Sequence, residues 1–175
     1  MNDPAVFSVI MPTYNRADLI ERAMNSVWEQ DYRPIELIIV DDGSTDHTSE
    51  VVSAWQQVHS NKDFTLLYTV QENAGAGAAR NTGIKHHSGQ FVQFLDSDDI
   101  IHPQRFSKLV TAFEKNGTDF IQTGFENVDT NSEELIGIRY GRLKNTIYEQ
   151  MLMGVLWPNT LRSALKSDLV KRIDP

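Results

Sequence analysis

The sequence predicts an α/β fold, a three-layer sandwich in which helices cover both faces of a mainly parallel sheet. Apolar runs rich in β-branched and aromatic residues recur at intervals of roughly 28 residues, about the length of one strand–helix unit. Segments with a helical period of apolar residues lie between these runs. Strands that alternate with helices are typical of parallel sheets buried on both faces.

Five apolar runs are expected to form the strands, in this order: Val6–Met11, Ile35–Val40, Phe64–Val70, Phe91–Leu95 and Asp119–Phe125. The apolar faces of the first, second and fourth helices are carried by Leu19, Ile20, Ala23, Met24, Val27 and Trp28, by Val51, Val52 and Trp55, and by Phe106, Leu109, Val110 and Phe113. The third helix, about Gly75 to His87, is rich in Gly and Ala and has little apolar pattern. Start signals precede helix two at Ser44 or Thr45 and helix four at His102–Pro103.

The alternation stops near Glu126, and the last third of the chain is less regular. The expected elements are a loop over 127–134, a strand over 135–140, a short helix over 146–153, a strand over 160–165 and a helix over 167–173. We expect a single domain over 1–175, with a regular half over 1–125 and a less regular half over 126–175. A helical turn runs straight into Pro175, which predicts a fragment truncated at its carboxyl end.

Composition bounds the function. The 175 residues carry a net charge of −8, which disfavours nucleic acid or an anionic membrane as a general partner. The absence of cysteine excludes disulfides and thiolate zinc sites and fits a reducing compartment. The amino-terminal residues lack a signal-peptide pattern and no apolar run is long enough to span a membrane. We therefore expect a cytoplasmic protein, with peripheral association at the inner face of a membrane left open.

The strongest chemical signal is a buried strand that runs into three carboxylates. Phe91–Leu95 leads directly into Asp96, Asp98 and Asp99. Three like charges this close are costly unless a cation or hydrogen-bond donors compensate them. A hard divalent metal such as Mn²⁺ or Mg²⁺ prefers carboxylate oxygens and often carries the phosphates of a substrate. The sequence therefore predicts a metal site at the end of the fourth strand.

Polar clusters follow each of the first four strands, over residues 12–16, 41–44, 73–81 and 96–99. The carboxyl ends of parallel strands share one edge of a sheet, where ligands bind in open α/β folds. The clusters are therefore expected to converge on one cleft. That convergence is stronger evidence for a site than any single cluster.

Each cluster also has a purely structural interpretation. Residues 41–44 suit a turn with a helix cap, and residues 96–99 could cap helix four, although three carboxylates exceed what a cap needs. Tyr14 could be an exposed turn aromatic or could stack on a base. The run Gly75–Ala79 nearly fits a dinucleotide fingerprint, but Arg80 stands where Gly or Ala is required. A small-residue helix start with an arginine suits phosphate or base contact better.

Taken together, four ordered motifs resemble the family 2 glycosyltransferases of the GT-A fold, a Rossmann-like α/β architecture. The motifs are Ser8–Arg16, Ile38–Asp46, Ala79–Gly83 and Phe94–Asp99, and the resemblance extends from about Val6 to Phe113. Residues 158–173 also resemble the acceptor-side strand and helix of that family. The resemblance thus implies a donor-binding and metal-binding half over 1–125 and the start of an acceptor half over 126–175. The order and spacing of these motifs make the resemblance specific.

The resemblance implies inverting, metal-assisted transfer of a sugar from a nucleotide-diphosphate sugar, usually a UDP-sugar. The acceptor would be a saccharide or a lipid-linked acceptor in polysaccharide or cell-surface glycan synthesis. The nucleotide-binding residues it implies are Pro12, Thr13, Tyr14, Asp41, Arg80, Asp96 and Ser97, with Asp41 on the base and Arg80 against the nucleotide. Asp98 is the implied metal ligand, with Asp96 near the ribose or the metal. Asp99 would help to position the loop.

The general base is the gap in this assignment. In the family it is an Asp or Glu beyond the strand and helix that residues 160–173 resemble, so it is expected beyond Pro175. The late carboxylates of this chain do not match that context; they are Glu126, Asp129, Glu133, Glu134, Asp168 and Asp174. Three alternatives stay open: a nucleotidyltransferase, a phosphatase with Asp96 as nucleophile, and a non-catalytic domain that binds nucleotide-sugar. The motifs specify neither the donor sugar, the acceptor and its linkage, nor the oligomeric state.

Overall fold

The computed structural model describes residues 5–59, 61–128, 135–139 and 163–172. The strands are β1 (Phe7–Thr13), β2 (Ile35–Asp41), β3 (Phe64–Val70), β4 (Phe91–Phe94), β5 (Phe120–Gln122), β6 (Phe125–Val128), β7 (Leu135–Arg139) and β8 (Ser163–Lys166). The helices are α1 (Ile20–Trp28), α2 (Thr48–Val58), α3 (Ala76–His86), α4 (Arg105–Asn116) and α6 (Ser167–Arg172).

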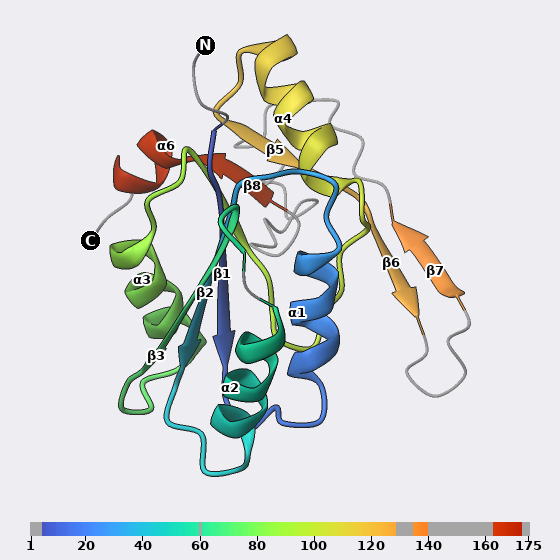
Figure 1. Cartoon of the computed structure of the whole chain (residues 1–175). Helices are drawn as coiled ribbons and strands as arrows, with labels where there is room; N and C mark the ends of the chain where they lie inside the picture. The colour runs from blue at the N-terminus through green and yellow to red at the C-terminus, as the bar shows by residue number, and fades with distance from the viewer. Residues whose placement is uncertain (1–4, 60, 129–134, 140–162, 173–175) are drawn as a thin grey trace, which may run out of the picture.

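Six strands form one sheet in the order β3-β2-β1-β4-β8-β5 (Figure 1). β1 pairs in parallel with β2 and with β4, so Phe7 lies opposite both Ile35 and Phe91. β8 runs antiparallel to its neighbours β4 and β5, which makes the sheet mixed but mainly parallel. β6 and β7 form a separate antiparallel pair.

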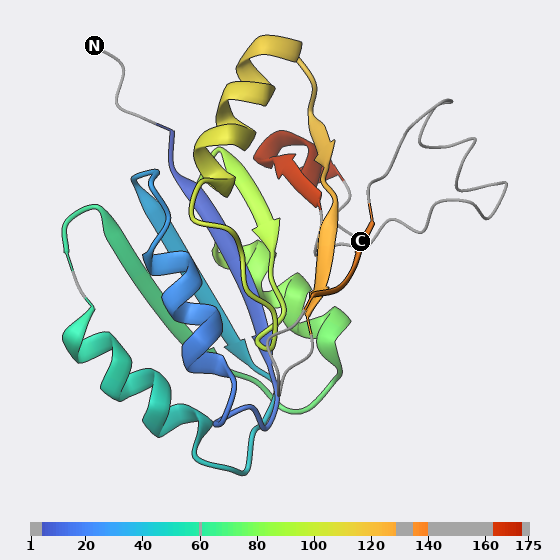
Figure 2. The same ribbon diagram turned by 90° about the vertical axis from the view of Figure 1, so that its right-hand side faces the viewer.

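Helices cover both faces of the sheet, which gives the expected three layers (Figures 1 and 2). One face, with α1, α2 and α4, encloses a core that includes Phe7, Phe106 and Trp55. The other face carries α3 and α6 over Ile10 and Val92. Phe7 and Phe106 stack with their ring centroids 4.0 Å apart, which fixes α4 against the central strand. The α/β fold class is therefore confirmed.

Differences from the predicted elements fall mainly at their ends. β1 and β2 each extend to the last ladder pair, Thr13 with Asp41, so the polar cluster after each strand begins inside the sheet. Phe125 does not end β5; it begins β6 in the second sheet. The strands predicted over 135–140 and 160–165 and the helix over 167–173 correspond to β7, β8 and α6. The helix predicted over 146–153 lies outside the described residues.

Neither Ser44 nor Thr45 starts the second helix. α2 begins at Thr48, because the expected cap residues are engaged by the neighbouring loop. Ser44 Oγ accepts a hydrogen bond from the N–H of Asn15 at 2.9 Å, and the N–H of Thr45 donates to Asn15 Oδ1 at 2.8 Å. α4 begins at Arg105, two residues after Pro103. Within the described ranges, no helix combines the length and apolarity needed to cross a membrane.

Candidate functional site

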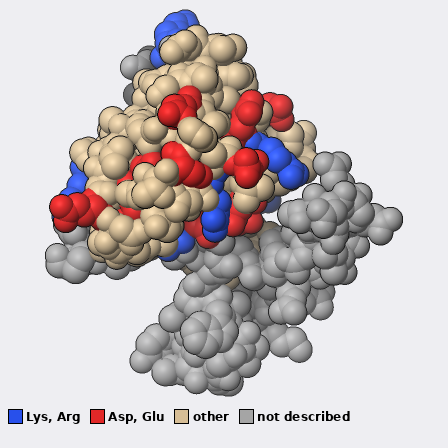
Figure 3. Space-filling view, turned by 90° about the horizontal axis from the view of Figure 1, so that it is seen from below, with Lys and Arg blue, Asp and Glu red and all other residues tan. Residues whose placement is uncertain are grey.

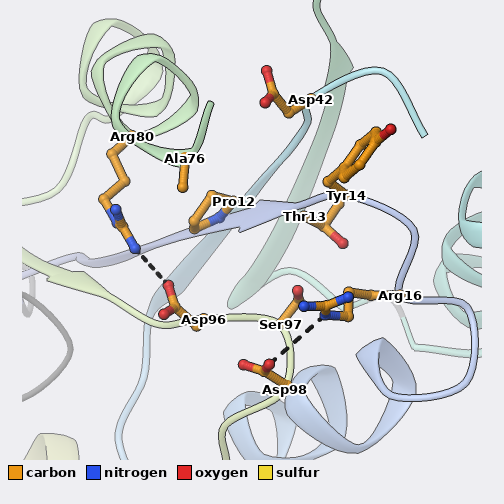
Figure 4. A pocket seen from close by; sticks show the side chains of 10 residues that line it. All are labelled: Pro12, Thr13, Tyr14, Arg16, Asp42, Ala76, Arg80, Asp96, Ser97 and Asp98. Atoms are coloured by element: carbon orange, nitrogen blue, oxygen red, sulfur yellow. Dashed lines mark hydrogen bonds and ion pairs between the residues drawn. The ribbon is translucent and has the colours of Figure 1, made fainter. Parts of the chain in front are cut away.

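An open pocket lies where the chain reverses its direction of progress across the sheet. From β1 the chain adds β2 and β3 on one side, and then returns to place β4 on the other side of β1. The helices that follow β1 and β3, α1 and α3, lie on opposite faces of the sheet, and ligands bind at such switch points in open α/β sheets. The pocket is lined by Pro12, Thr13, Tyr14, Arg16, Asp42, Ala76, Arg80, Asp96, Ser97 and Asp98 (Figure 4).

All four polar clusters predicted after the strands contribute to this one pocket. The β1 end supplies Pro12, Thr13, Tyr14 and Arg16, the β2 end supplies Asp42, α3 supplies Ala76 and Arg80, and the β4 end supplies Asp96, Ser97 and Asp98. Figure 3 views the molecule from below, where the β1 and β2 arrows end, and acidic and basic side chains gather together on that face. The expected convergence of the clusters is what the structure shows.

Asn15 fixes the shape of the loop that follows β1. Its backbone takes a left-handed conformation, with φ of 52°, which Asn tolerates better than most residues. The side-chain Oδ1 accepts hydrogen bonds from the N–H groups of Thr45 and Asp46. Asp46 in turn accepts from the N–H of Ala17 at 3.1 Å. These bonds tie the β1–α1 loop to the β2–α2 loop and hold Tyr14 at the pocket, where it is 46% exposed.

Asp41 and Asp42 lie in different environments although they are neighbours in sequence. Asp41 ends β2 and is not among the residues that line the pocket. One of its oxygens accepts from the N–H of Ser44 at 2.7 Å and the other from the hydroxyl of Tyr68. Burial, and then the hydrogen bond to Asp41, raise the pKa of Tyr68. Asp42, which was not singled out from the sequence, is the carboxylate of this pair that faces the pocket.

Asp42 is 4% exposed and holds the loop that leads into α3. Its Oδ1 accepts from the side-chain amide of Gln71 at 2.7 Å and from the N–H of Ala74 at 2.9 Å, and its Oδ2 accepts from the N–H of Gly75 at 2.7 Å. Burial works to raise the pKa of Asp42, but these three donors outweigh it and hold that pKa below the ordinary value. Asp42 is therefore an anion at neutral pH.

Two of the three carboxylates after β4 are paired with an arginine from another element. Arg80 Nη2 on α3 lies 2.7 Å from Asp96 Oδ1, and Arg16 Nε lies 3.7 Å from Asp98 Oδ2 (Figure 4). Partial burial raises the pKa of Asp99, and the charges of Asp98 and Asp96 raise it further. This crowding shows that the loop still carries an excess of negative charge. Arg16 is a pocket residue that was not singled out from the sequence.

The donor set suits a divalent metal that is shared with a ligand. Asp96 and Asp98 both line the pocket, and in each carboxylate the described contacts occupy one oxygen. Among the described residues, no group of three or more His, Asp or Glu side chains could hold a metal. Two carboxylates fit a Mg²⁺-like or Mn²⁺-like ion that takes its other ligands from water and substrate phosphates. The chemistry of the site thus fits the metal predicted from the sequence.

The remaining predicted nucleotide residues, Pro12, Thr13 and Ser97, line the same pocket and are buried. The Thr13 hydroxyl is buried with no hydrogen-bond partner in the described part of the chain.

The pocket contains three carboxylates and two guanidinium groups, so its side chains carry one net negative charge. A bound divalent cation would make the net charge positive, which suits a diphosphate.

Fold and site together define an α/β domain of the nucleotide-binding type, with its ligand pocket at the switch point of the sheet. The chain belongs to Glycosyl transferase family 2: the sequence model of that family matches residues 8–163. An uncharacterized glycosyltransferase of Rickettsia felis is 32% identical over 145 residues, 83% of this chain and 23% of that protein. Glycosyltransferase GlyA of Streptococcus pneumoniae is 43% identical over 94 residues, 54% of this chain and 13% of that protein. The matched segment is thus a minor part of both relatives.

Comparison with solved structures identifies the fold. Residues 1–349 of S. aureus TarS in complex with UDP-GlcNAc superpose with a TM-score of 0.76 at 26% identity. The match covers 96% of this chain and 47% of that chain. The resemblance to family 2 glycosyltransferases of the GT-A fold is therefore confirmed.

Proposed function

We propose that this domain binds a nucleotide-diphosphate sugar, with a UDP-sugar favoured, and transfers the sugar with inversion to a saccharide or lipid-linked acceptor. The observation that carries the proposal is a shared pocket in which Tyr14 after β1, Asp42 after β2, Arg80 of α3, and Asp96 and Asp98 after β4 meet. An exposed aromatic, a buried anion, a guanidinium and two carboxylates match the base, ribose and diphosphate parts of such a donor. The UDP-GlcNAc complex of TarS supports the donor class.

The residues divide by the part of the donor they suit. Tyr14 offers a ring face for the base, with Pro12 and Thr13 beside it, and Asp42 can accept a hydrogen bond from a base N–H. This assignment gives Asp42 the role that the resemblance gave to Asp41, because Asp42 faces the pocket. Ser97 and Asp96 are assigned to the ribose side and Arg80 to the diphosphate.

Asp96 and Asp98 would hold the divalent metal, Mn²⁺ or Mg²⁺. Such a metal, when bound, neutralises negative charge that develops on the diphosphate as the glycosidic bond breaks. Asp98 presents the more exposed of the two carboxylates, with 46% exposure against 30% for Asp96. Arg80 and Arg16 keep guanidinium donors at the same edge of the pocket and would share the diphosphate charge.

The general base is assigned to none of the described pocket carboxylates. Asp42 accepts three hydrogen bonds, and Asp96 and Asp98 are paired with arginines and assigned to the metal. A base must reach the acceptor hydroxyl on the face of the sugar opposite the leaving group. We therefore propose that the base is supplied from outside this set of pocket carboxylates. The division into a donor half over 1–125 and an acceptor half over 126–175 is part of this proposal, as are a cytoplasmic location and an acceptor in cell-surface glycan synthesis.

A domain that binds nucleotide-sugar without turnover is the second candidate, favoured by the same lack of an assigned base in the pocket. The two functions share the donor site and differ in chemistry alone. Family membership weighs against both the nucleotidyltransferase and the phosphatase. The phosphatase would also need Asp96 as its nucleophile, although Arg80 donates a hydrogen bond to one of the Asp96 oxygens. A phospho-enzyme intermediate trapped on Asp96 would support the phosphatase function instead.

Thermal unfolding with UDP, GDP and TDP, each with and without Mn²⁺, tests the proposed donor site. A ligand at 100 times its Kd stabilises by about 2.7 kcal/mol, which raises the Tm of a chain of this size by about 5 to 11 °C. We expect this shift for UDP with Mn²⁺, and its loss in Asp98→Asn. Asp18→Asn is the control, since Asp18 is exposed in the loop between β1 and α1 and does not line the pocket. If none of the three nucleotides raises the Tm, with or without Mn²⁺, the proposal is contradicted.

A further inference from the structure

Both carboxylates assigned to the metal are occupied by arginines of the same chain. Arg80 reaches Asp96 from α3, and Arg16 reaches Asp98 from the β1–α1 loop, so two separate elements close on one short loop (Figure 4). The Arg80–Asp96 pair is the tighter, at 2.7 Å, with side chains that are 22% and 30% exposed. The Arg16–Asp98 pair is longer, at 3.7 Å, with side chains that are 44% and 46% exposed.

Each partner in these pairs is suited to a different part of the donor complex. A carboxylate oxygen is a ligand for a divalent cation, whereas a guanidinium forms forked hydrogen bonds with phosphate. Arg80 also keeps a buried Nε that has no hydrogen-bond partner in the described part of the chain, so its donors are not all used. Metal and diphosphate thus compete with existing ion pairs, the metal for the carboxylates and the diphosphate for the guanidinium groups.

We propose that Arg80 and Arg16 are internal counter-ions that make metal and diphosphate bind as a coupled pair. This inference rests on the proposed donor site and adds a role for the arginines in the donor-free protein. A metal that arrives alone binds a carboxylate whose other oxygen Arg80 already engages, and repulsion between the cation and the guanidinium weakens that ion pair. A diphosphate that arrives alone has to draw Arg80 from Asp96 and leave three pocket carboxylates with less compensation. When both arrive, each released charge finds a new partner.

The proposal predicts an effect that direct contact between metal and phosphate does not produce. If the arginines only bound phosphate, their removal would weaken nucleotide binding and leave metal binding in the absence of nucleotide unchanged. If they also occupy the carboxylates, their removal strengthens metal binding in the absence of nucleotide. The coupling is reciprocal, so the factor by which metal raises nucleotide affinity equals the factor by which nucleotide raises metal affinity.

The test is calorimetric titration of the whole chain with Mn²⁺ and with UDP, each in the absence and presence of the other. In the wild-type protein we expect coupling within the usual range of about 5- to 150-fold. Arg80→Gln is expected to raise the affinity for Mn²⁺ alone by about fivefold and to reduce the coupling factor by a similar amount. Arg16→Gln should act in the same direction with a smaller effect, because its pair is longer and more exposed.

Lys85→Gln is the matched control, because it removes the same charge from an exposed position of α3. Equal affinity for Mn²⁺ in Arg80→Gln and Lys85→Gln would overturn the proposal, as would undiminished coupling in both arginine variants. These results would leave the donor site intact. A wild-type chain that binds no UDP with or without Mn²⁺ would instead overturn the donor site, and the coupling with it.

Discussion

Asp42→Ala is expected to lower the free energy of unfolding by about 3 kcal/mol or more, because it removes the acceptor of three hydrogen bonds. The side-chain amide of Gln71 and the N–H groups of Ala74 and Gly75 would lose their partner at a position that is 4% exposed. A hydrogen bond to a charged group contributes about 1.5 to 3 kcal/mol, and water can replace part of that contribution at Ala74 and Gly75, which are exposed. Chemical denaturation measures the loss, and Glu72→Ala is the control, since Glu72 is exposed in the adjoining loop.

The same side chain makes stability depend on pH in a defined direction. The pKa of Asp42 is lower in the folded protein than its ordinary value of about 3.9. Its contribution to stability is therefore complete above that ordinary value and is lost as the pH falls through the lower folded pKa. The difference in stability between wild type and Asp42→Ala should be constant near neutral pH and should shrink in that acid range. A difference that grows on acidification would contradict the assigned hydrogen bonds.

Gly83→Ala is expected to lower stability by about 1 to 3 kcal/mol, the usual range for overpacking a core. A Cβ at this position of α3 would overlap Cγ2 of Ile10 and would lie 3.3 Å from its Cβ and Cγ1. Ile10 is fully buried in β1, so it has little room to move. The helix would have to lift from the sheet, and Arg80 lies three residues earlier on it. We therefore also expect weaker nucleotide binding in this variant.

Gly77→Ala on the same helix is the matched control. A Cβ at Gly77 would meet nothing within 4 Å. Gly77 is the second residue of α3, where replacing Gly by Ala stabilises the helix by at most roughly 0.5 to 1 kcal/mol when nothing clashes. The two substitutions should therefore change the midpoint of denaturation in opposite directions. Equal effects would show that the contact between α3 and β1 is not as close as the structure has it.

Much of the fold could be predicted from the sequence because the strands of a buried parallel sheet are apolar along their whole length. Phe64–Val70 was predicted with the bounds that β3 has. The ends were less predictable, because pairing partners decide where a strand stops. β2 includes Asp41 since Thr13 and Val70 flank it in the ladders, and nothing local to Asp41 contains that information.

The dependence of strand ends on their pairing partners also explains why the sequence did not identify which carboxylate of residues 41 and 42 lines the pocket. The sequence motifs predicted that the four clusters converge on one cleft, but they did not distinguish Asp41 from Asp42. Successive residues at a strand end face different surroundings, so a shift of one residue exchanges a buried structural carboxylate for one that lines the pocket. The pairing of Arg16 with Asp98 spans most of the donor half of the chain. Such contacts arise from the topology of the sheet and have no local signal.

The most direct test of the donor site is a crystal structure of the chain with UDP and Mn²⁺. We predict the base beside Tyr14 and Asp42, the diphosphate toward Arg80, and the metal between the diphosphate and the carboxylates of Asp96 and Asp98. UDP bound at another surface, or a metal bound without contact to Asp96 or Asp98, would contradict this account of the site.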